Sequence, residues 1–244
     1  DNDYGNKLPK RSEAWRIASQ DQEFKNISVE KKTKGTYEVI TEFSLKNINS
    51  TYTITYILNG NGEVKVEADF DYNGKLKNAE VPRVGLNFGI LKNFSQVKWY
   101  GRGPHENYID RKSSAYLGVY KSTVEDLYFA YARPQENGYR TDNRWVSLTD
   151  NSGKGIQILG LPKFSFSAHY NTIEDFDIGE EERNYKRPQR HTTDIKPRDF
   201  ISLNVDLKQS GVGGDNSWGA RPWGKYEIKP TNYNFGFIMK PIKK

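Results

Sequence analysis

The sequence contains no cysteine and only three histidines among its 244 residues. The absence of cysteine excludes disulfide bonds, cysteine-based zinc sites and thiol nucleophiles. It leaves the compartment open between cytoplasm and periplasm, because disulfide-free proteins occur in both. The histidines, His105, His169 and His191, are widely separated along the chain. We therefore expect no metal site built on them.

Long hydrophobic runs are also missing. No run approaches the roughly 18 apolar residues of a membrane-spanning helix, so we expect no membrane partner. No secretory leader is visible at the start, and the chain begins with Asp1 rather than methionine. We therefore expect a fragment or a processed chain.

Positive charge is in excess, with a net charge of +6 and a pI of about 9.2. The lysines and arginines are scattered, however, and acidic residues are interleaved with them. We find no basic helix and no RNA-binding aromatic motif, so we expect no nucleic-acid partner.

Hydrophobic residues make up only 35% of the chain, but this share includes 14% aromatic residues. Each aromatic side chain can bury a large area, so a hydrophobic core is still expected. Apolar and polar residues alternate over 52–58 and over 64–70, on either side of Asn59-Gly60-Asn61-Gly62. Two alternating runs around an Asn-Gly turn predict a β-hairpin.

Short alternating runs recur along most of the chain, each bounded by Gly, Pro, Asn or Asp. Further strands are expected at 36–43, 84–88, 97–100, 115–120, 144–149, 155–159, 164–169, 200–206, 225–229 and 233–239. Short helical turns are expected at 122–125 and 171–175, an irregular segment anchored by Trp15 at 1–20, and a surface loop at 180–199. Many short strands without a sustained helical period predict a single all-β, antiparallel domain, as a sandwich or barrel.

The most distinctive stretch, 211–219, reads Gly-Val-Gly-Gly-Asp-Asn-Ser-Trp-Gly. Its glycines permit positive φ angles, and its Asp, Asn and Ser can close turns. Trp218 therefore either fills the core beneath a tight connection or is presented to a ligand. An indole face suits the apolar C–H face of a sugar ring.

Two further stretches, one around Glu106 and one around Glu136, combine turn formers with charges. Their spacing predicts ion pairs between Glu106 and Arg111 and between Glu136 and Arg140. The alternative is that these loops line a cleft. We expect a polar rim, in which exposed ion pairs contribute about 0–1 kcal/mol each to stability.

Five motifs, in order, resemble the C-terminal domain of β-galactosidases of glycoside hydrolase family 2. They are Asp1-Asn-Asp-x-Gly5, Trp99-Tyr-Gly-x-Gly-Pro-x-Glu-Asn-Tyr-x-Asp-Arg111, Pro134-Gln-Glu-Asn-Gly-x-Arg140, Phe164-Ser-Phe-Ser-Ala168 followed by Glu174-Asp175, and Gly211-Val-Gly-Gly-Asp-Asn-Ser-Trp218. The resemblance covers essentially the whole chain. Where Asn216 stands, the family often has a second Asp, so this loop carries one charge fewer.

The resemblance implies an antiparallel β super-sandwich, similar to that of galactose mutarotases, as one domain spanning 1–244. This domain packs beside the catalytic barrel and other domains of a parent enzyme that hydrolyses terminal β-D-galactosides. The resemblance places Trp218 in the active-site mouth, against the sugar next to the cleaved bond. Further loop or cleft candidates are Asp215, Asn216, Glu136, Asn137 and Arg140.

Catalytic carboxylates are not expected in this chain. Retaining glycosidases need two carboxyl groups about 5 Å apart, and in the resembling family both lie on the barrel. Glu136 and Asp215 are the only motif acids worth testing as substitutes. The resemblance assigns no cofactor to this part, leaves Mg or Na ions to other domains, and implies a homo-oligomeric parent.

Two other functions remain open at this point. A stand-alone carbohydrate-binding module would use the tryptophan loop to bind glycan by itself, which sugar titration would detect. An aldose epimerase would need a histidine paired with a carboxylate for proton transfer. His105 and Glu106 are adjacent, and adjacent strand residues point to opposite faces, which disfavours that pair.

Overall fold

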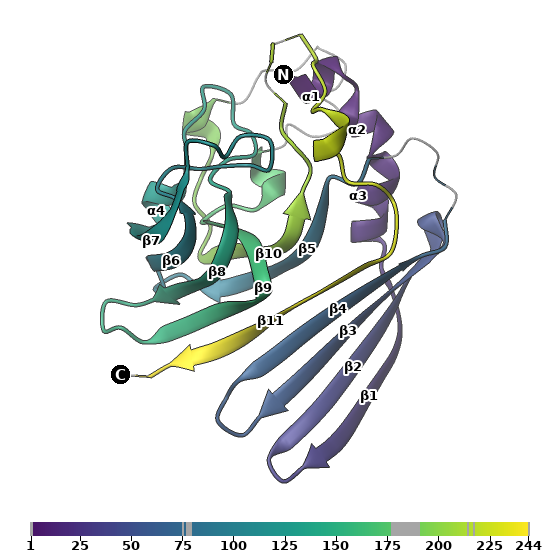
Figure 1. The fold of residues 1–244 in the computed structure, drawn as a ribbon, viewed down its shortest axis with the longest axis vertical. Coiled ribbons are helices and arrows are strands. Elements are labelled where there is room, and N and C mark those ends of the chain that lie inside the picture. Colours follow the sequence, from purple (N-terminus) through teal and green to yellow (C-terminus); the bar gives the residue numbers. More distant parts are fainter. Residues whose placement is uncertain are drawn as a thin grey trace.

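The structure is a computed structural model that describes residues 2–74, 76, 80–176, 191–213, 215, 216 and 218–243. Within this part of the chain, antiparallel β-strands dominate and helices are short (Figure 1). The strands are β1 (Glu23–Thr33), β2 (Thr36–Leu45), β3 (Ser50–Asn59), β4 (Val64–Tyr72), β5 (Arg83–Leu91), β6 (Gln96–Gly103), β7 (Tyr116–Thr123), β8 (Arg140–Thr149), β9 (Gly155–His169), β10 (Phe200–Gln209) and β11 (Tyr233–Ile242). The predicted all-β, antiparallel class is confirmed.

Short helical elements connect or flank the strands. The α-helices are α1 (Asn2–Gly5), α2 (Leu8–Arg11), α3 (Glu13–Gln20) and α4 (Val124–Leu127), and the 3-10 turns are η1 (Lys46–Ile48), η2 (Ile173–Phe176), η4 (Thr192–Asp194) and η5 (Gly224–Tyr226). Within the described residues, no helix has the length and hydrophobicity required to cross a membrane.

The sheet follows the order β1-β2-β3-β4-β11-β9-β8-β6-β7, and β10 pairs with both β9 and β5. Strand β9 joins the β10–β5 pair to the rest of the sheet, because its first half pairs with β11 and its second half pairs with β10. The two strands expected at 155–159 and 164–169 are therefore one continuous strand. Elements distant in sequence lie side by side, as β4 and β11 do in Figure 1.

The predicted hairpin around Asn59-Gly60-Asn61-Gly62 is confirmed as β3 and β4. Its register pairs Ile54 with Ala68 and Tyr56 with Val66, so these side chains share one face. Val66 and Ala68 are buried. Apolar alternation thus gave the correct face as well as the correct turn.

The main core gathers aromatic and aliphatic side chains from most strands, among them Trp99, Phe166, Leu203 and Phe237. Trp99 and Phe166 meet edge to face with ring centroids 6.0 Å apart. Full burial of each such side chain contributes on the order of 1.5–3 kcal/mol to stability. This core holds the strands whose ends carry the polar motifs.

A second, smaller core fastens the start of the chain to the sheet. Trp15 and Ala18 lie three residues apart on one face of α3, where they pack with Leu45 and Ile48. The anchoring role predicted for Trp15 is confirmed, but the expectation of an irregular segment at 1–20 is wrong. Burial of this narrow apolar face supports a helix that the polar composition concealed.

Other local expectations had mixed outcomes. The turn expected at 122–125 is found two residues later as α4, and its cap is Thr123, whose Oγ1 accepts a hydrogen bond from Asp126 N at 3.1 Å. The turn expected at 171–175 is found as η2. The strand expected at 225–229 is wrong, because η5 occupies its start. Of the loop expected at 180–199, residues 180–190 lie outside the described residues.

Candidate functional site: the tryptophan loop

The connection from β10 to β11 carries the most exposed tryptophan side chain described. Trp218 is 88% exposed. Its backbone N–H donates to Asn216 Oδ1 at 2.8 Å, and the following Gly219 has φ +103°, which favours glycine. This local turn projects the indole outward, as expected from the glycine-rich sequence.

The base of this loop is tied to the first polar motif. Asp110 Oδ2 accepts a hydrogen bond from Gly213 N at 2.8 Å. A Cβ atom added at Gly211 would lie only 2.7 Å from the same oxygen, so a larger residue would displace this contact. Asp110 therefore orients the loop, a role that the sequence did not reveal.

The start of the chain supports the loop from another side. A Cβ atom added at Gly219 would lie 2.6 Å from the carbonyl carbon of Gly5. The two backbones approach this closely because both residues are glycine. Asn6 Nδ2 also donates to Ala220 O at 3.4 Å. Three of the five sequence motifs thus meet at the base of the Trp218 loop.

Asp215 and Asn216 lie on the exposed part of the same loop. Asp215 lines a hollow of about 190 Å³ together with Asp110, Arg221 and Trp223. Trp223 is a second exposed indole in this connection, and Lys225 Nζ lies 4.9 Å from its ring centroid. The loop therefore offers aromatic and polar groups to a ligand without enclosing one.

The second polar motif is arranged differently from what its sequence predicted. Glu136 pairs with Arg83 at 2.9 Å, not with Arg140. Arg140 instead donates to the carbonyl oxygens of Gly138, at 2.6 Å, and Pro104, at 3.1 Å. Gly138 has φ +72° and turns the chain between the two charged residues. The predicted Glu136–Arg140 ion pair is therefore wrong.

The predicted Glu106–Arg111 ion pair is confirmed at 2.7 Å. Glu106 also accepts hydrogen bonds from Tyr131 Oη and, at 2.7 Å, from Gly138 N. Its side chain is largely buried, although Arg111 is half exposed. Glu106 thereby connects the two polar motifs directly.

Buried amides extend this connection. Asn137 Oδ1 accepts from Phe129 N at 3.0 Å, and Asn137 Nδ2 donates to Gln135 O at 2.9 Å. Asn137 and Arg140 are both buried. The expectation of a polar rim is wrong for these residues, because they brace loops from inside the protein.

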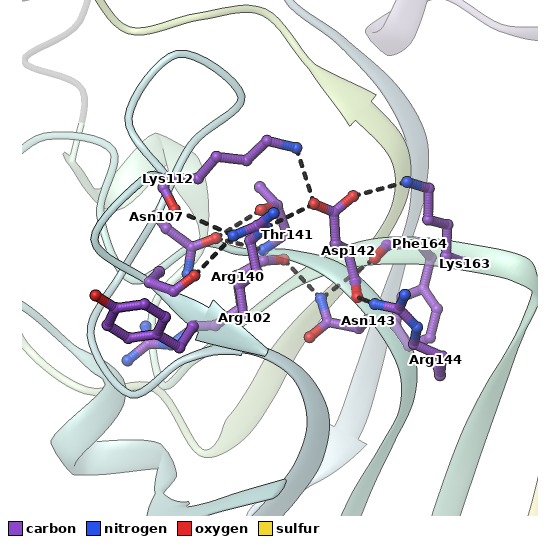
Figure 2. A network of polar contacts seen from close by, with 12 residues as sticks. Arg102, Asn107, Lys112, Arg140, Thr141, Asp142, Asn143, Arg144, Lys163 and Phe164 are labelled. Atoms are coloured by element: carbon purple, nitrogen blue, oxygen red, sulfur yellow. Dashed lines mark hydrogen bonds and ion pairs between the residues drawn. The ribbon is translucent and has the colours of Figure 1, made fainter. Parts of the chain in front are cut away.

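A network at the start of β8 continues the bracing (Figure 2). Asp142 has a positive φ of 55° and accepts hydrogen bonds from Arg102 and Lys112, both at 2.8 Å, and from Lys163 at 2.9 Å. Burial alone would raise the pKa of Asp142, but these three cationic donors outweigh it and lower the pKa. Asn143, beside it, donates to Arg140 O and Phe164 O.

A partly buried charged cluster links Glu136 to the end of β10. Arg83 Nη2 donates to Glu136 Oε2 at 2.9 Å and to Gln209 Oε1 at 2.6 Å, and its Nε lies 3.4 Å from Asp206. Burial raises the pKa of Asp206 to about 7, against the lowering effect of Arg83. Burial also raises the pKa of Glu136.

Only part of this cluster can meet a ligand. Arg83 and Glu136 line a cleft of about 550 Å³, together with Trp15, Arg133 and Phe176. Asp206 is 1% exposed and does not line that cleft. Sequence reasoning missed Arg83 and Asp206, because they lie on β5 and β10 and no short-range motif contains them.

Within the part of the chain that the structure describes, neither His169 nor His105 forms a hydrogen bond or ion pair with a carboxylate. His169 is buried, its Nε2 lies 2.9 Å from Asn137 O, and burial lowers its pKa to about 4. His105 is exposed and lies 3.1 Å from Ser114 Oγ. Among the described residues, no cluster of three or more potential metal ligands occurs.

Sequence comparisons relate the chain to known proteins. The family model described as beta galactosidase small chain matches residues 1–239. A beta-galactosidase of Priestia megaterium is 36% identical over 244 residues, covering 99% of this chain and 22% of that protein. A beta-galactosidase of Streptococcus thermophilus is 29% identical over 258 residues, covering 99% of this chain and 23% of that protein. The chain thus spans less than a quarter of either relative.

Structural similarity is more distant. A galactose mutarotase related enzyme of Lactobacillus acidophilus is 10% identical with a TM-score of 0.41, covering 90% of this chain and 72% of that chain. The galactosidase domain of an alpha-galactosidase-sucrose kinase is 10% identical with a TM-score of 0.45, covering 91% of this chain and 28% of that chain.

Proposed function

Because the chain belongs to the beta galactosidase small chain family, we propose that it completes the active-site mouth of a larger β-galactosidase. In this proposal the parent enzyme belongs to glycoside hydrolase family 2, hydrolyses terminal β-D-galactosides, and carries its catalytic carboxylates on a separate barrel. The observation that carries the proposal is the exposed indole of Trp218 on a loop braced from several sides.

Trp218 would act by stacking on the sugar next to the cleaved bond. Its indole offers a flat apolar surface, and covering that surface is worth on the order of 1–3 kcal/mol. The contacts of Gly213 with Asp110 and of Gly219 with Gly5 hold the loop base before any ligand arrives. Such preorganisation reduces the ordering cost of binding.

The chain alone is proposed to be catalytically silent. A retaining glycosidase needs two accessible carboxyl groups about 5 Å apart. Glu136 is engaged by Arg83, Asp206 is buried, and Asp215 lies on the exposed loop. We therefore assign none of these acids to hydrolysis, and a pure 244-residue chain should not turn over a chromogenic galactoside.

Trp218→Ala in the full-length enzyme tests the proposal. We expect the Michaelis constant for a β-galactoside to rise by about 5- to 150-fold, the equivalent of 1–3 kcal/mol. Trp223→Ala is the matched control, because it removes another exposed indole of the same connection. An unchanged Michaelis constant together with a much lower melting temperature would instead assign Trp218 to stability.

A carbohydrate-binding module is the second candidate, because an exposed indole can also bind glycan without a catalytic partner. Titration of the isolated chain with galactose and lactose distinguishes the two. We expect little or no binding, since one stacking face without converging hydrogen-bond donors and acceptors is a weak site. Clear binding that Trp218→Ala abolishes would favour the module.

A further inference from the structure

The apolar face that β4 turns toward the main core continues across β3 and β2 to the edge strand β1, beyond the core itself. Cross-strand neighbours share a face, and three rows of them run from β4 through β3 and β2 to β1. The rows are Phe70-Tyr52-Phe43-Phe24, Ala68-Ile54-Thr41-Ile27 and Val66-Tyr56-Val39-Val29. Figure 1 shows β1 and β2 on the side of the sheet away from β5 and β10.

Burial declines along each row. Val66 and Ala68, on β4, are fully buried, whereas Ile27 and Val29, on β1, are 54% and 65% exposed. Phe24 is exposed as well, although its ring meets Phe43 with centroids 6.0 Å apart. Among the described residues, nothing covers this end of the rows.

The opposite face of β1 has a different character. Asn26, Ser28 and Glu30 alternate with the apolar residues and therefore point to the other side of the sheet. This one-sided pattern is typical of a strand with one face packed and one face in water. On β1, however, the face with the composition of a core is uncovered.

The free edge of β1 is guarded against strand addition. Register shifts interrupt the strand between Phe24 and Asn26 and between Lys31 and Thr33. Lysines lie near both shifts, at 25, 31 and 32. Bulges and lysines are the usual protection against edge-to-edge pairing. The edge is therefore unsuited to a second copy of the chain, while the apolar face remains available.

We propose that this face, formed by Phe24, Ile27 and Val29 with Tyr37 and Leu58 beside them, docks against the part of the parent β-galactosidase that lies outside these 244 residues. This docking rests on the proposed function. We choose this occupant because the matched Priestia megaterium enzyme has 78% of its length beyond the aligned part (100% less 22%). Exposed apolar surfaces of this kind mark protein interfaces.

Cysteine labelling of the full-length enzyme tests the docking, since these 244 residues contain no cysteine. Ile27→Cys and Val29→Cys place a thiol on the apolar face, and Ser28→Cys places one on the opposite face of the same strand. All three positions are exposed in this chain. We expect maleimide to modify the first two at least about tenfold more slowly than the third, because a docked face must open before it reacts.

The unmodified enzyme gives the background from any cysteines elsewhere, and labelling in denaturant confirms that each new thiol can react. Equal native labelling rates at all three positions would overturn the docking. This outcome would leave the role of Trp218 untouched, because galactoside kinetics are measured separately. Conversely, protection at Ile27 and Val29 with no effect of Trp218→Ala on kinetics would retain the docking and remove the active-site role.

Discussion

The Trp218 loop and the network around Asp142 both depend on hydrogen bonds of polar residues, yet they differ in how exposed those residues are and in how they are held. The loop exposes its central side chain and is held mainly at its base. The network buries its amides and pairs Asp142 with three cations (Figure 2). Polar residues thus present a side chain to solvent in one region and support the fold in the other.

This contrast indicates where the replacement of a polar residue lowers the stability of the fold. When a buried amide is removed, its former hydrogen-bond partners stay buried without a partner and without water. Each such group lowers the stability of the fold by about 1–3 kcal/mol. An exposed side chain leaves its partners free to hydrate. Substitutions in the network should therefore lower stability, and substitutions at the loop tip should change binding.

The largest expected effect is that of Asn107→Ala. Asn107 is fully buried, and its Oδ1 accepts hydrogen bonds from Thr141 N, at 3.0 Å, and Thr141 Oγ1, at 2.6 Å. We expect the free energy of unfolding to fall by about 3–5 kcal/mol, measured by urea denaturation. Asn216→Ala, on the exposed loop, is the matched control and should cost far less. Equal losses of stability in the two variants would contradict the proposed difference between the buried network and the exposed loop.

His169 should make stability depend on pH. Burial holds its folded pKa at about 4, below the ordinary value of 6.5. As pH falls from about 6.5 to 4, the unfolded chain binds a proton that the folded chain does not, so stability is lost. This loss should reach about 2–3 kcal/mol relative to His169→Gln. Parallel stability curves for the two proteins over that range would contradict the assignment.

Asp110→Ala should have an intermediate effect, on binding and not on chemistry. Loss of the hydrogen bond to Gly213 N loosens the loop base. We expect the Michaelis constant of the full-length enzyme to rise about fivefold, the equivalent of about 1 kcal/mol, with partial rescue by Asp110→Asn. Because Asp110 would act through Trp218, Asp110→Ala should raise the Michaelis constant little further in an enzyme that already carries Trp218→Ala. A full additive effect would mean an independent role.

The smallest expected effect is that of Trp218→Ala on stability. The side chain is 88% exposed, so its removal uncovers little apolar surface. We expect the free energy of unfolding to change by no more than about 0.5 kcal/mol. A loss comparable to that of Asn107→Ala would place the indole in the fold rather than in the site.

Local patterns predicted the features that depend on neighbours in sequence. Alternation around an Asn-Gly turn predicted the β3–β4 hairpin and its buried face. Strand β1 escaped prediction because a bulge at Lys25 shifts the alternation between Phe24 and Ile27. A pattern of strict period two cannot detect a strand with an extra residue.

The candidate site was predictable only at its tip. The glycine-rich sequence allowed Trp218 either to fill the core or to be presented to a ligand, and the structure exposes its side chain. Its supports, Asp110 and Gly5, come from other parts of the chain and meet only after folding. The Arg83–Asp206 pair joins two different strands, so it too depends on tertiary structure.

The contact between Gly5 and Gly219 has a practical consequence for anyone who engineers the ends of this chain. If the first turns of helix are trimmed or replaced, one wall of the Trp218 loop is lost, while the sheet keeps its pairing. If Trp218 contacts the sugar as proposed, a deletion or replacement of this segment in the full-length enzyme would raise the Michaelis constant without unfolding the sheet. Such a protein would look like an active-site mutant although no active-site residue had been changed.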